Sequence, residues 1–164
     1  MSVMGDDPKF EMAWELYLRA CQLQAQGDYE LSADLCRQSL HLHPTAEAHT
    51  ALAYTFDQQG RREEALAECR AAIGLDPALG NPYNDMGAYL IELGRPEEAI
   101  PWLEQATRAL RYASYHYPWY NLGRAYVAQE LFCKARDCFQ HALDIEPEYE
   151  PAQEALKQVR RLLQ

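Results

Sequence analysis

Five cysteines are the side chains of this chain whose chemistry could include nucleophilic catalysis or redox exchange. The thiolate is the reactive form, and a nucleophilic cysteine needs a base such as His held beside it. No His or Asp falls in register with Cys36 or Cys69, and the chain has no C-x-x-C pair. An odd number of cysteines without such a pair is typical of a reducing compartment. We therefore predict structural cysteines, with Cys21 as the one to test for reactivity.

Two histidines, His41 and His43, are the nearest approach to a metal site. A helix would place them on different faces, and no Cys/His cluster supplies a third and a fourth ligand. We interpret both as exposed residues at the end of a helix. The sequence also lacks a Gly-rich phosphate loop, a G-x-S-x-G motif and an H-E-x-x-H motif. It therefore predicts no metal, no cofactor and no enzyme activity.

The formal net charge of −10 over 164 residues restricts the class of partner. An acidic surface repels phosphate backbones and anionic membranes, and it attracts basic peptides. No stretch approaches the roughly 18 apolar residues of a membrane span, and the N-terminus lacks the basic and apolar regions of a secretory signal. We expect a cytoplasmic protein with no nucleic-acid partner and no membrane insertion. A protein or peptide ligand is expected, and charge favours a basic one.

The elements that must position these residues recur about every 34 positions. A glycine that would end a helix appears as Gly27, Gly60 and Gly94, and Glu130 stands where the fourth copy falls. A fixed period of this length is typical of stacked-repeat proteins. Within each period, apolar residues follow one face of a helix twice over. Each repeat is therefore predicted to be a pair of amphipathic helices.

The fourth repeat resembles the tetratricopeptide repeat (TPR) signature, W-x2-L-G-x2-Y followed by A-x3-F-x2-A and P. Its matching residues are Trp119, Leu122, Gly123, Tyr126, Ala135, Phe139, Ala142 and Pro147. The second and third repeats match most positions, whereas the first has Ser32 and Ser39 in place of Ala. The resemblance implies an all-α fold: a right-handed α-solenoid of about four TPR helix–turn–helix repeats plus a C-terminal capping helix.

The repeat pattern also divides the chain. We expect residues 1–9 to form a disordered tail and residues 10–149 to form the TPR solenoid. Its repeats are expected at about 13–45, 46–79, 80–115 and 116–149. Residues 150–164 show one more amphipathic pattern, and a terminal helix with a polar outer face would cap the stack.

The third repeat departs from the pattern. Pro101 falls inside its second helix, where Pro usually costs roughly 3 kcal/mol, so we expect a late start or a bend. Arg111 replaces the usual Pro, which predicts that this helix runs on past its usual end. The segment from Tyr112 to Tyr120 then brings several aromatic residues together. They would either fill an enlarged junction between repeats or form a platform for a peptide.

In TPR proteins the first helix of each repeat lines a concave groove, and the resemblance implies the same role here. The implied peptide-binding residues are Tyr17, Cys21, Gln24, Tyr54, Asp57, Asn84, Asp85, Tyr117, Tyr120, Asn121 and Arg124. An Asn amide can bond a peptide backbone through both of its ends, and Arg124 is a candidate for a carboxylate. The clamp of Lys, Asn and Arg residues that chaperone-binding TPR proteins use is absent, so chaperone C-termini are not expected ligands.

The function expected from this resemblance is a non-enzymatic scaffold that binds a partner peptide or protein segment in the groove. The alternative is a self-associating assembly or accessory factor of a secretion or pilus-type system, in which a homo-oligomer would form. An enzyme relying on Cys21 is the third and weakest hypothesis.

Overall fold

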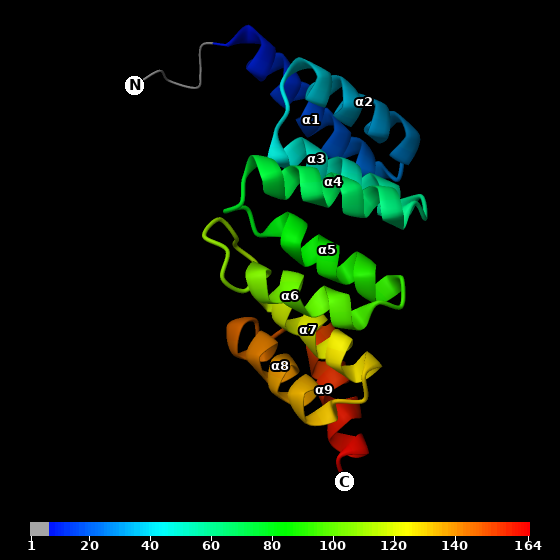
Figure 1. The fold of residues 1–164 in the computed structure, drawn as a ribbon, viewed down its shortest axis with the longest axis vertical. Coiled ribbons are helices and arrows are strands. Elements are labelled where there is room, and N and C mark those ends of the chain that lie inside the picture. Colours follow the sequence, from blue (N-terminus) through cyan, green and yellow to red (C-terminus); the bar gives the residue numbers. More distant parts are fainter. Residues whose placement is uncertain (1–6) are drawn as a thin grey trace. The chain divides into compact units, whose positions relative to one another are not determined.

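The computed structural model describes residues 7–164, and the regular structure in that range is helical throughout (Figure 1). The helices fall into two compact units, an N-terminal unit that ends at Pro77 and a C-terminal unit that begins at Ala78. The predicted all-α fold of stacked helical pairs is confirmed. Among the described helices, none is both long enough and apolar enough to cross a bilayer.

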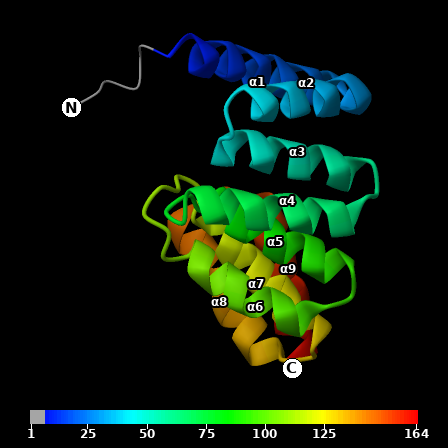
Figure 2. The same cartoon turned by 45° about the horizontal axis from the view of Figure 1, so that its top comes forward.

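The N-terminal unit consists of two helical hairpins (Figure 2). Three of its four helices begin at a residue whose side chain accepts a hydrogen bond from one of the first backbone N–H groups. Asp7 and Thr45 cap two of them, since their side chains accept hydrogen bonds from the backbone N–H groups of Lys9 and Ala48. The helices are α1 (Pro8–Gln26), α2 (Tyr29–Leu42), α3 (Ala46–Gln58) and α4 (Arg62–Leu75).

The C-terminal unit contains two further hairpins and a final helix. Its helices are α5 (Asn81–Glu92), α6 (Pro96–Ala106), α7 (His116–Ala128), α8 (Phe132–Ile145) and α9 (Glu150–Leu162). The helix α9 packs against α8 and lies within the segment expected to form a C-terminal helix. Its buried residues Ala152, Leu156 and Val159 explain why it docks.

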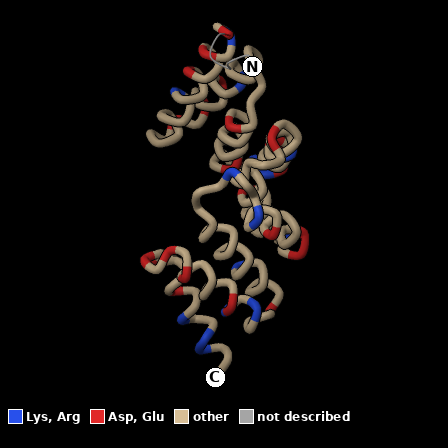
Figure 3. The backbone as a smooth tube through the Cα atoms, turned by 90° about the vertical axis from the view of Figure 1, so that its left-hand side faces the viewer, with Lys and Arg blue, Asp and Glu red and all other residues tan. Residues whose placement is uncertain are grey.

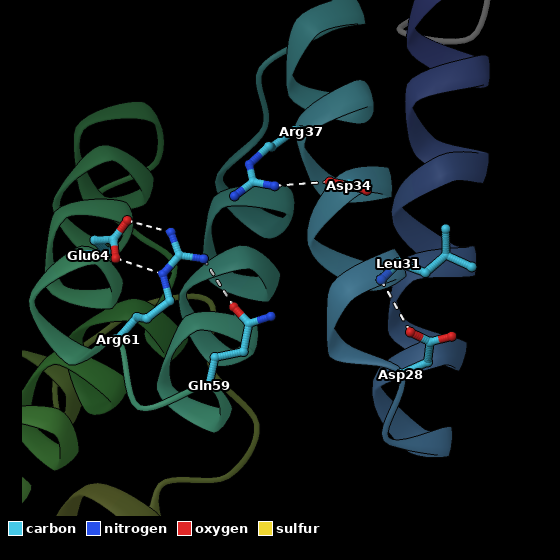
Figure 4. Close-up of polar contacts among 7 residues, drawn as sticks. All are labelled: Asp28, Leu31, Asp34, Arg37, Gln59, Arg61 and Glu64. Atoms are coloured by element: carbon cyan, nitrogen blue, oxygen red, sulfur yellow. Dashed lines mark hydrogen bonds and ion pairs between the residues drawn. The ribbon is translucent and has the colours of Figure 1, made fainter.

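Each hairpin turns at a residue in the left-handed conformation. Gly60 has φ 75° and Gly94 has φ 74°, and Glu130 adopts φ 59° at the equivalent turn without the freedom of a glycine. After Gly60, Arg61 and Glu64 form two hydrogen bonds of 2.7 and 2.6 Å that close the first turn of α4 (Figure 4). The two charged residues at this helix start are therefore paired, and both side chains are partly exposed.

Close packing inside the hairpins depends on glycine in the C-terminal unit. A Cβ atom built on Gly123 would lie 2.3 Å from Cε1 of Phe139, and one built on Gly87 would lie 2.3 Å from Cγ of Leu103. Both distances are far below van der Waals contact. A glycine at each of these two positions therefore allows the neighbouring helix to approach closely.

Two expectations about helix ends are wrong. The helix α6 ends at Ala106 and does not run on, although Pro101 lies inside it. The residues after α6 form a loop that folds back on the start of α5, where the Arg111 N–H donates to the Ala78 carbonyl at 2.9 Å. Pro8 and Lys9, assigned from the sequence to the tail, belong to α1. The rest of the expected tail, residues 1–6, lies outside the described residues.

Candidate functional site

The predicted peptide-binding residues lie on α1 and α3 in the N-terminal unit and on α5 and α7 in the C-terminal unit. These are the first helices of their hairpins. Each unit therefore presents its own set of candidate side chains, and the two sets differ in character.

In the N-terminal unit, Tyr17 and Cys21 lie one helical turn apart on α1, and each influences the ionisation of the other. The ring of Tyr17 is tilted against Trp14 with 4.8 Å between centroids. Burial raises the pKa of the Tyr17 hydroxyl well above its usual value, with smaller contributions from Cys21 and Glu47. Burial also raises the pKa of the Cys21 thiol, although Tyr17 opposes that rise. Cys21 therefore carries no sign of an activated thiolate.

The other three candidates in this unit are unequally available. Gln24 is used internally, since its Nε2 donates to the Ala51 carbonyl at 2.7 Å and to Thr55 Oγ1 at 2.8 Å. Asp57 accepts a 2.8 Å hydrogen bond from Arg62 Nε in an ion pair. Tyr54 is 41% exposed.

In the C-terminal unit, polar side chains form a chain of hydrogen bonds from α5 to α7. Asn121 Nδ2 donates to Asn84 Oδ1 at 3.0 Å, and Arg124 Nη1 donates to Asn121 Oδ1 at 3.1 Å. Arg124 Nη2 also pairs with Glu92, and Asn84 Nδ2 donates to Asp85 Oδ1 at 3.4 Å. The structure thus brings four of the predicted residues together, with Asn121 buried among them.

Three tyrosines gather beside this polar chain. The ring of Tyr149 meets Tyr120 and Tyr117 edge-on, at 5.3 and 5.5 Å between centroids. Burial and the neighbouring Tyr120 raise the pKa of Tyr149 to about 12, and the charge of Arg124 opposes that rise. Tyr120 also contacts Phe139 at 5.7 Å. Tyr117 is 42% exposed, so the cluster reaches the surface.

The aromatic residues between Tyr112 and Tyr120 divide between the two roles considered from the sequence, internal packing and a surface for a peptide. Tyr112 and Tyr115 pack on each other at 5.4 Å, and Tyr115 Oη donates to the Ala109 carbonyl at 2.6 Å. Burial raises the pKa of Tyr112 above its usual range. These two rings hold the loop after α6, whereas Tyr117 and Tyr120 belong to the surface cluster.

Beside Tyr120 lies a pocket of about 340 Å³. It is bordered by residues of α5, α7, α8 and α9, and its wall is mainly apolar. The lining residues are Ile91, Tyr120, Arg124, Val127, Ala128, Phe139, Ala155, Gln158, Val159 and Leu162. Arg124 places a cation at its edge, and that cation is already paired with Glu92.

Sequence reasoning missed Tyr149 and the contribution of α9. The final helix was expected only to cap the stack, yet four of its residues line the pocket. The repeat register contains the missing information, because 34 residues beyond Asn121 and Arg124 lie Ala155 and Gln158. The helix α9 thus takes the place of a first helix of a further repeat. Tyr149 has no counterpart in the repeat signature, so no pattern identified it.

The other cysteine and histidine side chains considered from the sequence lie in surroundings that are typical of structural residues. Cys36 and Cys69 are fully buried as predicted, and burial raises the pKa of the Cys36 thiol to about 12. His41 is exposed as expected, but His43 is not, since it ends α2 and meets the Phe10 ring at 5.2 Å. Within residues 7–164, no group of three or more His, Cys, Asp or Glu side chains is arranged to hold a metal ion.

Comparison with known proteins gives the same family along most of the chain. Family models described as tetratricopeptide repeat match residues 17–79, 81–109 and 117–149. The type IV pilus assembly protein PilF of Pseudomonas aeruginosa is 29% identical over 119 residues, which cover 72% of this chain and 47% of that protein. A protein SGT1 homolog of Oryza sativa is 33% identical over 93 residues, covering 56% and 25%. The chain therefore spans between a quarter and about half of the relatives it matches.

Solved structures share the fold. The structure of Pseudomonas aeruginosa PilF has a TM-score of 0.88 at 23% identity, covering 93% of this chain and 69% of that one. PilW, described as a widely conserved type IV pilus biogenesis factor, has a TM-score of 0.85 at 20% identity, covering 92% and 69%. At these identities the likeness is one of fold.

Proposed function

This chain belongs to the tetratricopeptide repeat family, and we propose from that premise that it is a non-enzymatic scaffold whose C-terminal unit binds a segment of a partner protein. The segment lies over α5, α7 and α9 and inserts a side chain into the pocket beside Tyr120. Asn84, Asp85, Tyr117, Asn121 and Arg124 border or support this site. A cytoplasmic location stays a prediction.

The single observation that carries the proposal is the pocket itself, an apolar concavity next to a cluster of tyrosines. Aromatic anchors and small apolar pockets concentrate binding energy at protein interfaces. Because Glu92 already neutralises Arg124, a carboxylate of the partner would have to displace Glu92. The pocket is therefore matched to an aliphatic or aromatic side chain, and Arg124 is left to hold the polar chain in place.

The test uses peptides selected from a random library against the whole protein, with affinity then measured on purified variants. Tyr120→Ala should weaken binding at least tenfold, since loss of a central aromatic anchor usually costs about 2 kcal/mol. The control is Tyr29→Ala at the start of α2, because Tyr29 lies in the other unit, does not line the pocket, and its hydroxyl bonds the exposed Gln58 side chain at 3.4 Å. The control should retain affinity.

Circular dichroism on both variants establishes that the helices are intact. Equal affinity of folded Tyr120→Ala and wild type for every selected peptide would remove the proposal.

The second candidate function is that of an assembly or accessory factor in a pilus-type system. It is favoured by the similarity to PilF, a type IV pilus assembly protein, and it includes self-association. Sedimentation velocity over a range of concentrations tests the self-association, which would appear as a rise in sedimentation coefficient. Restored pilus assembly in a Pseudomonas aeruginosa strain that lacks PilF would support the accessory role, and failure despite normal expression would count against it.

A further inference from the structure

The N-terminal unit carries a second surface, which we call the aromatic–acidic face. It consists of Phe10, Trp14, Tyr17 and Leu18 on α1 together with Glu47 and Tyr54 on α3. The rings of Phe10 and Trp14 stack at 6.0 Å between centroids, and Trp14 meets Tyr17 at 4.8 Å. Leu18 is 47% exposed and Tyr54 is 41% exposed. The face therefore combines two exposed side chains with the half-buried rings of Phe10, Trp14 and Tyr17.

Acidic side chains border this face. Glu47 lies close enough to Tyr17 to influence its ionisation, and Glu11 and Glu15 are exposed on the side of α1 that bears Leu18. No Lys or Arg occurs in α3. In α1, Lys9 and Arg19 each stand five residues from Trp14, and the helical period turns both about 140° away from it.

The wider unit strengthens this field. Residues 1–77 contain 13 Asp and Glu against 6 Lys and Arg, and acidic positions follow the N-terminal helices in Figure 3. A surface of one sign raises the local concentration of oppositely charged ligands and speeds their association. This charge repels an acidic partner and does not attract a neutral one, whereas it attracts a cationic partner.

We propose that the aromatic–acidic face docks a basic segment of a partner protein, with an arginine side chain over the rings of Trp14 and Tyr17 and its charge directed to Glu47. A guanidinium stacks on an aromatic face and donates to a carboxylate at the same time. The aliphatic stem of the arginine would cover Leu18 and Tyr54. The inference rests on the scaffold function and adds to it the chemical class of a partner. It concerns a different unit from the Tyr120 pocket, so either site can fail alone.

The experiment measures binding of a fluorescent peptide of alternating Arg and Ser to the whole protein by anisotropy. A peptide with citrulline in place of Arg keeps the shape and removes the charge, and a Lys peptide keeps the charge without the planar group. The Arg peptide should bind most tightly, the Lys peptide more weakly and the citrulline peptide weakest.

Three variants locate the site. Glu47→Gln and Trp14→Leu should each weaken binding of the Arg peptide about tenfold, the change expected for about 1.4 kcal/mol. Glu30→Gln makes the same charge change at the exposed start of α2 and should shift affinity less than twofold. Tyr120→Ala should leave this affinity unchanged, which separates the present site from the C-terminal pocket.

Other outcomes overturn the proposal. Equal losses of affinity in Glu47→Gln and Glu30→Gln would show that binding of the peptide depends only on the net charge of the protein. Full affinity in Trp14→Leu would show that the aromatic ring makes no contribution. A second copy of this chain could also supply basic residues, since α9 ends with Arg160 and Arg161. Salt-sensitive self-association that Arg160→Gln with Arg161→Gln abolishes would assign the face to a second copy.

Discussion

In the hairpins of both units the two helices pack closely at one position, but the two units use different pairs of side chains there. In each hairpin, a small residue in the first helix stands 16 positions before a residue of the second helix. The N-terminal unit pairs Ala20 with Cys36 and Ala53 with Cys69, whereas the C-terminal unit pairs Gly87 with Leu103 and Gly123 with Phe139. All eight residues are buried. Where the residue on the second helix is the larger Leu or Phe, the residue on the first helix is glycine, which has no Cβ.

The two units also differ in the buried side-chain hydrogen bonds that stabilise their hairpins. In the N-terminal unit, Ser32 Oγ donates to the Ala20 carbonyl at 3.1 Å and Ser39 Oγ donates to the Ala13 carbonyl at 2.7 Å. Thr55 Oγ1 lies 3.3 Å from Ser32 Oγ and accepts from Gln24. The second hairpin of the N-terminal unit has Ala65 and Ala72 at the serine positions, and the C-terminal unit has Ala99, Ala106, Ala135 and Ala142 there.

This difference teaches that the repeat signature constrains summed volume more than residue identity. Protein interiors are packed as densely as organic crystals, so volume added on one side of a contact must be removed on the other. In the first hairpin of the N-terminal unit, the smaller apolar pair is supplemented by buried hydrogen bonds of Ser32 and Ser39, each worth about 1 kcal/mol net.

The largest effect is expected from Gly123→Ala, which would force a methyl group into the Phe139 ring. Overpacking of this kind costs about 1–3 kcal/mol of unfolding free energy, measurable by urea titration. The matched control is Gly74→Ala in α4, where nothing lies within 4 Å of the new Cβ. There the better helix propensity of Ala should stabilise the protein by up to about 1 kcal/mol.

A double variant sharpens that comparison. Adding Phe139→Leu to Gly123→Ala should cost less than the sum of the two single changes, because the smaller side chain makes room for the methyl group. Strict additivity would show that the two residues are not coupled, and the volume argument would then fail.

A smaller loss is expected from Thr55→Val, which keeps the shape of the side chain and removes its hydroxyl. Gln24 and Ser32 would each lose one partner in a buried setting, at a cost of about 1–2 kcal/mol. Thr50→Val in the same helix is the control, since the Thr50 hydroxyl bonds only the Ala46 carbonyl one turn earlier. The unfolding free energy of Thr50→Val should stay within about 0.5 kcal/mol of wild type.

If both threonine variants behave alike, the hydroxyl network contributes nothing to the N-terminal unit. Calorimetry of the same two proteins gives an independent measure, as a loss of 1 kcal/mol lowers Tm by several degrees in a domain of this size.

The smallest effect is a gain from Glu130→Gly at the turn between α7 and α8. Both hairpin turns of the N-terminal unit have glycine at this place, as does the turn after α5. Relieving a left-handed non-glycine residue should stabilise the protein by about 1 kcal/mol. Gly60→Ala should destabilise it by a similar amount, and urea titration measures both. A loss of stability in Glu130→Gly would indicate that the Glu130 side chain makes a compensating contact.

The 34-residue period, the helical pairs and the burial of Cys36 and Cys69 could all be read from the sequence, because each depends on spacing along one or two neighbouring helices. The position at which α6 ends could not be predicted from the sequence. Its position is decided by the loop that bonds back to Ala78 and by the fit of Tyr112 against Gly80, contacts between segments distant in the sequence.

The candidate site shows the same division. The sequence by itself determined which side chains lie on first helices, since periodicity alone assigns a residue to a helix face. Only the tertiary structure decided which of them are available: Gln24 and Asp57 are held by partners, Asn121 is buried, and Tyr149 joins Tyr117 and Tyr120. Availability depends on distances between helices, and those are set by the volumes of side chains that no repeating pattern records.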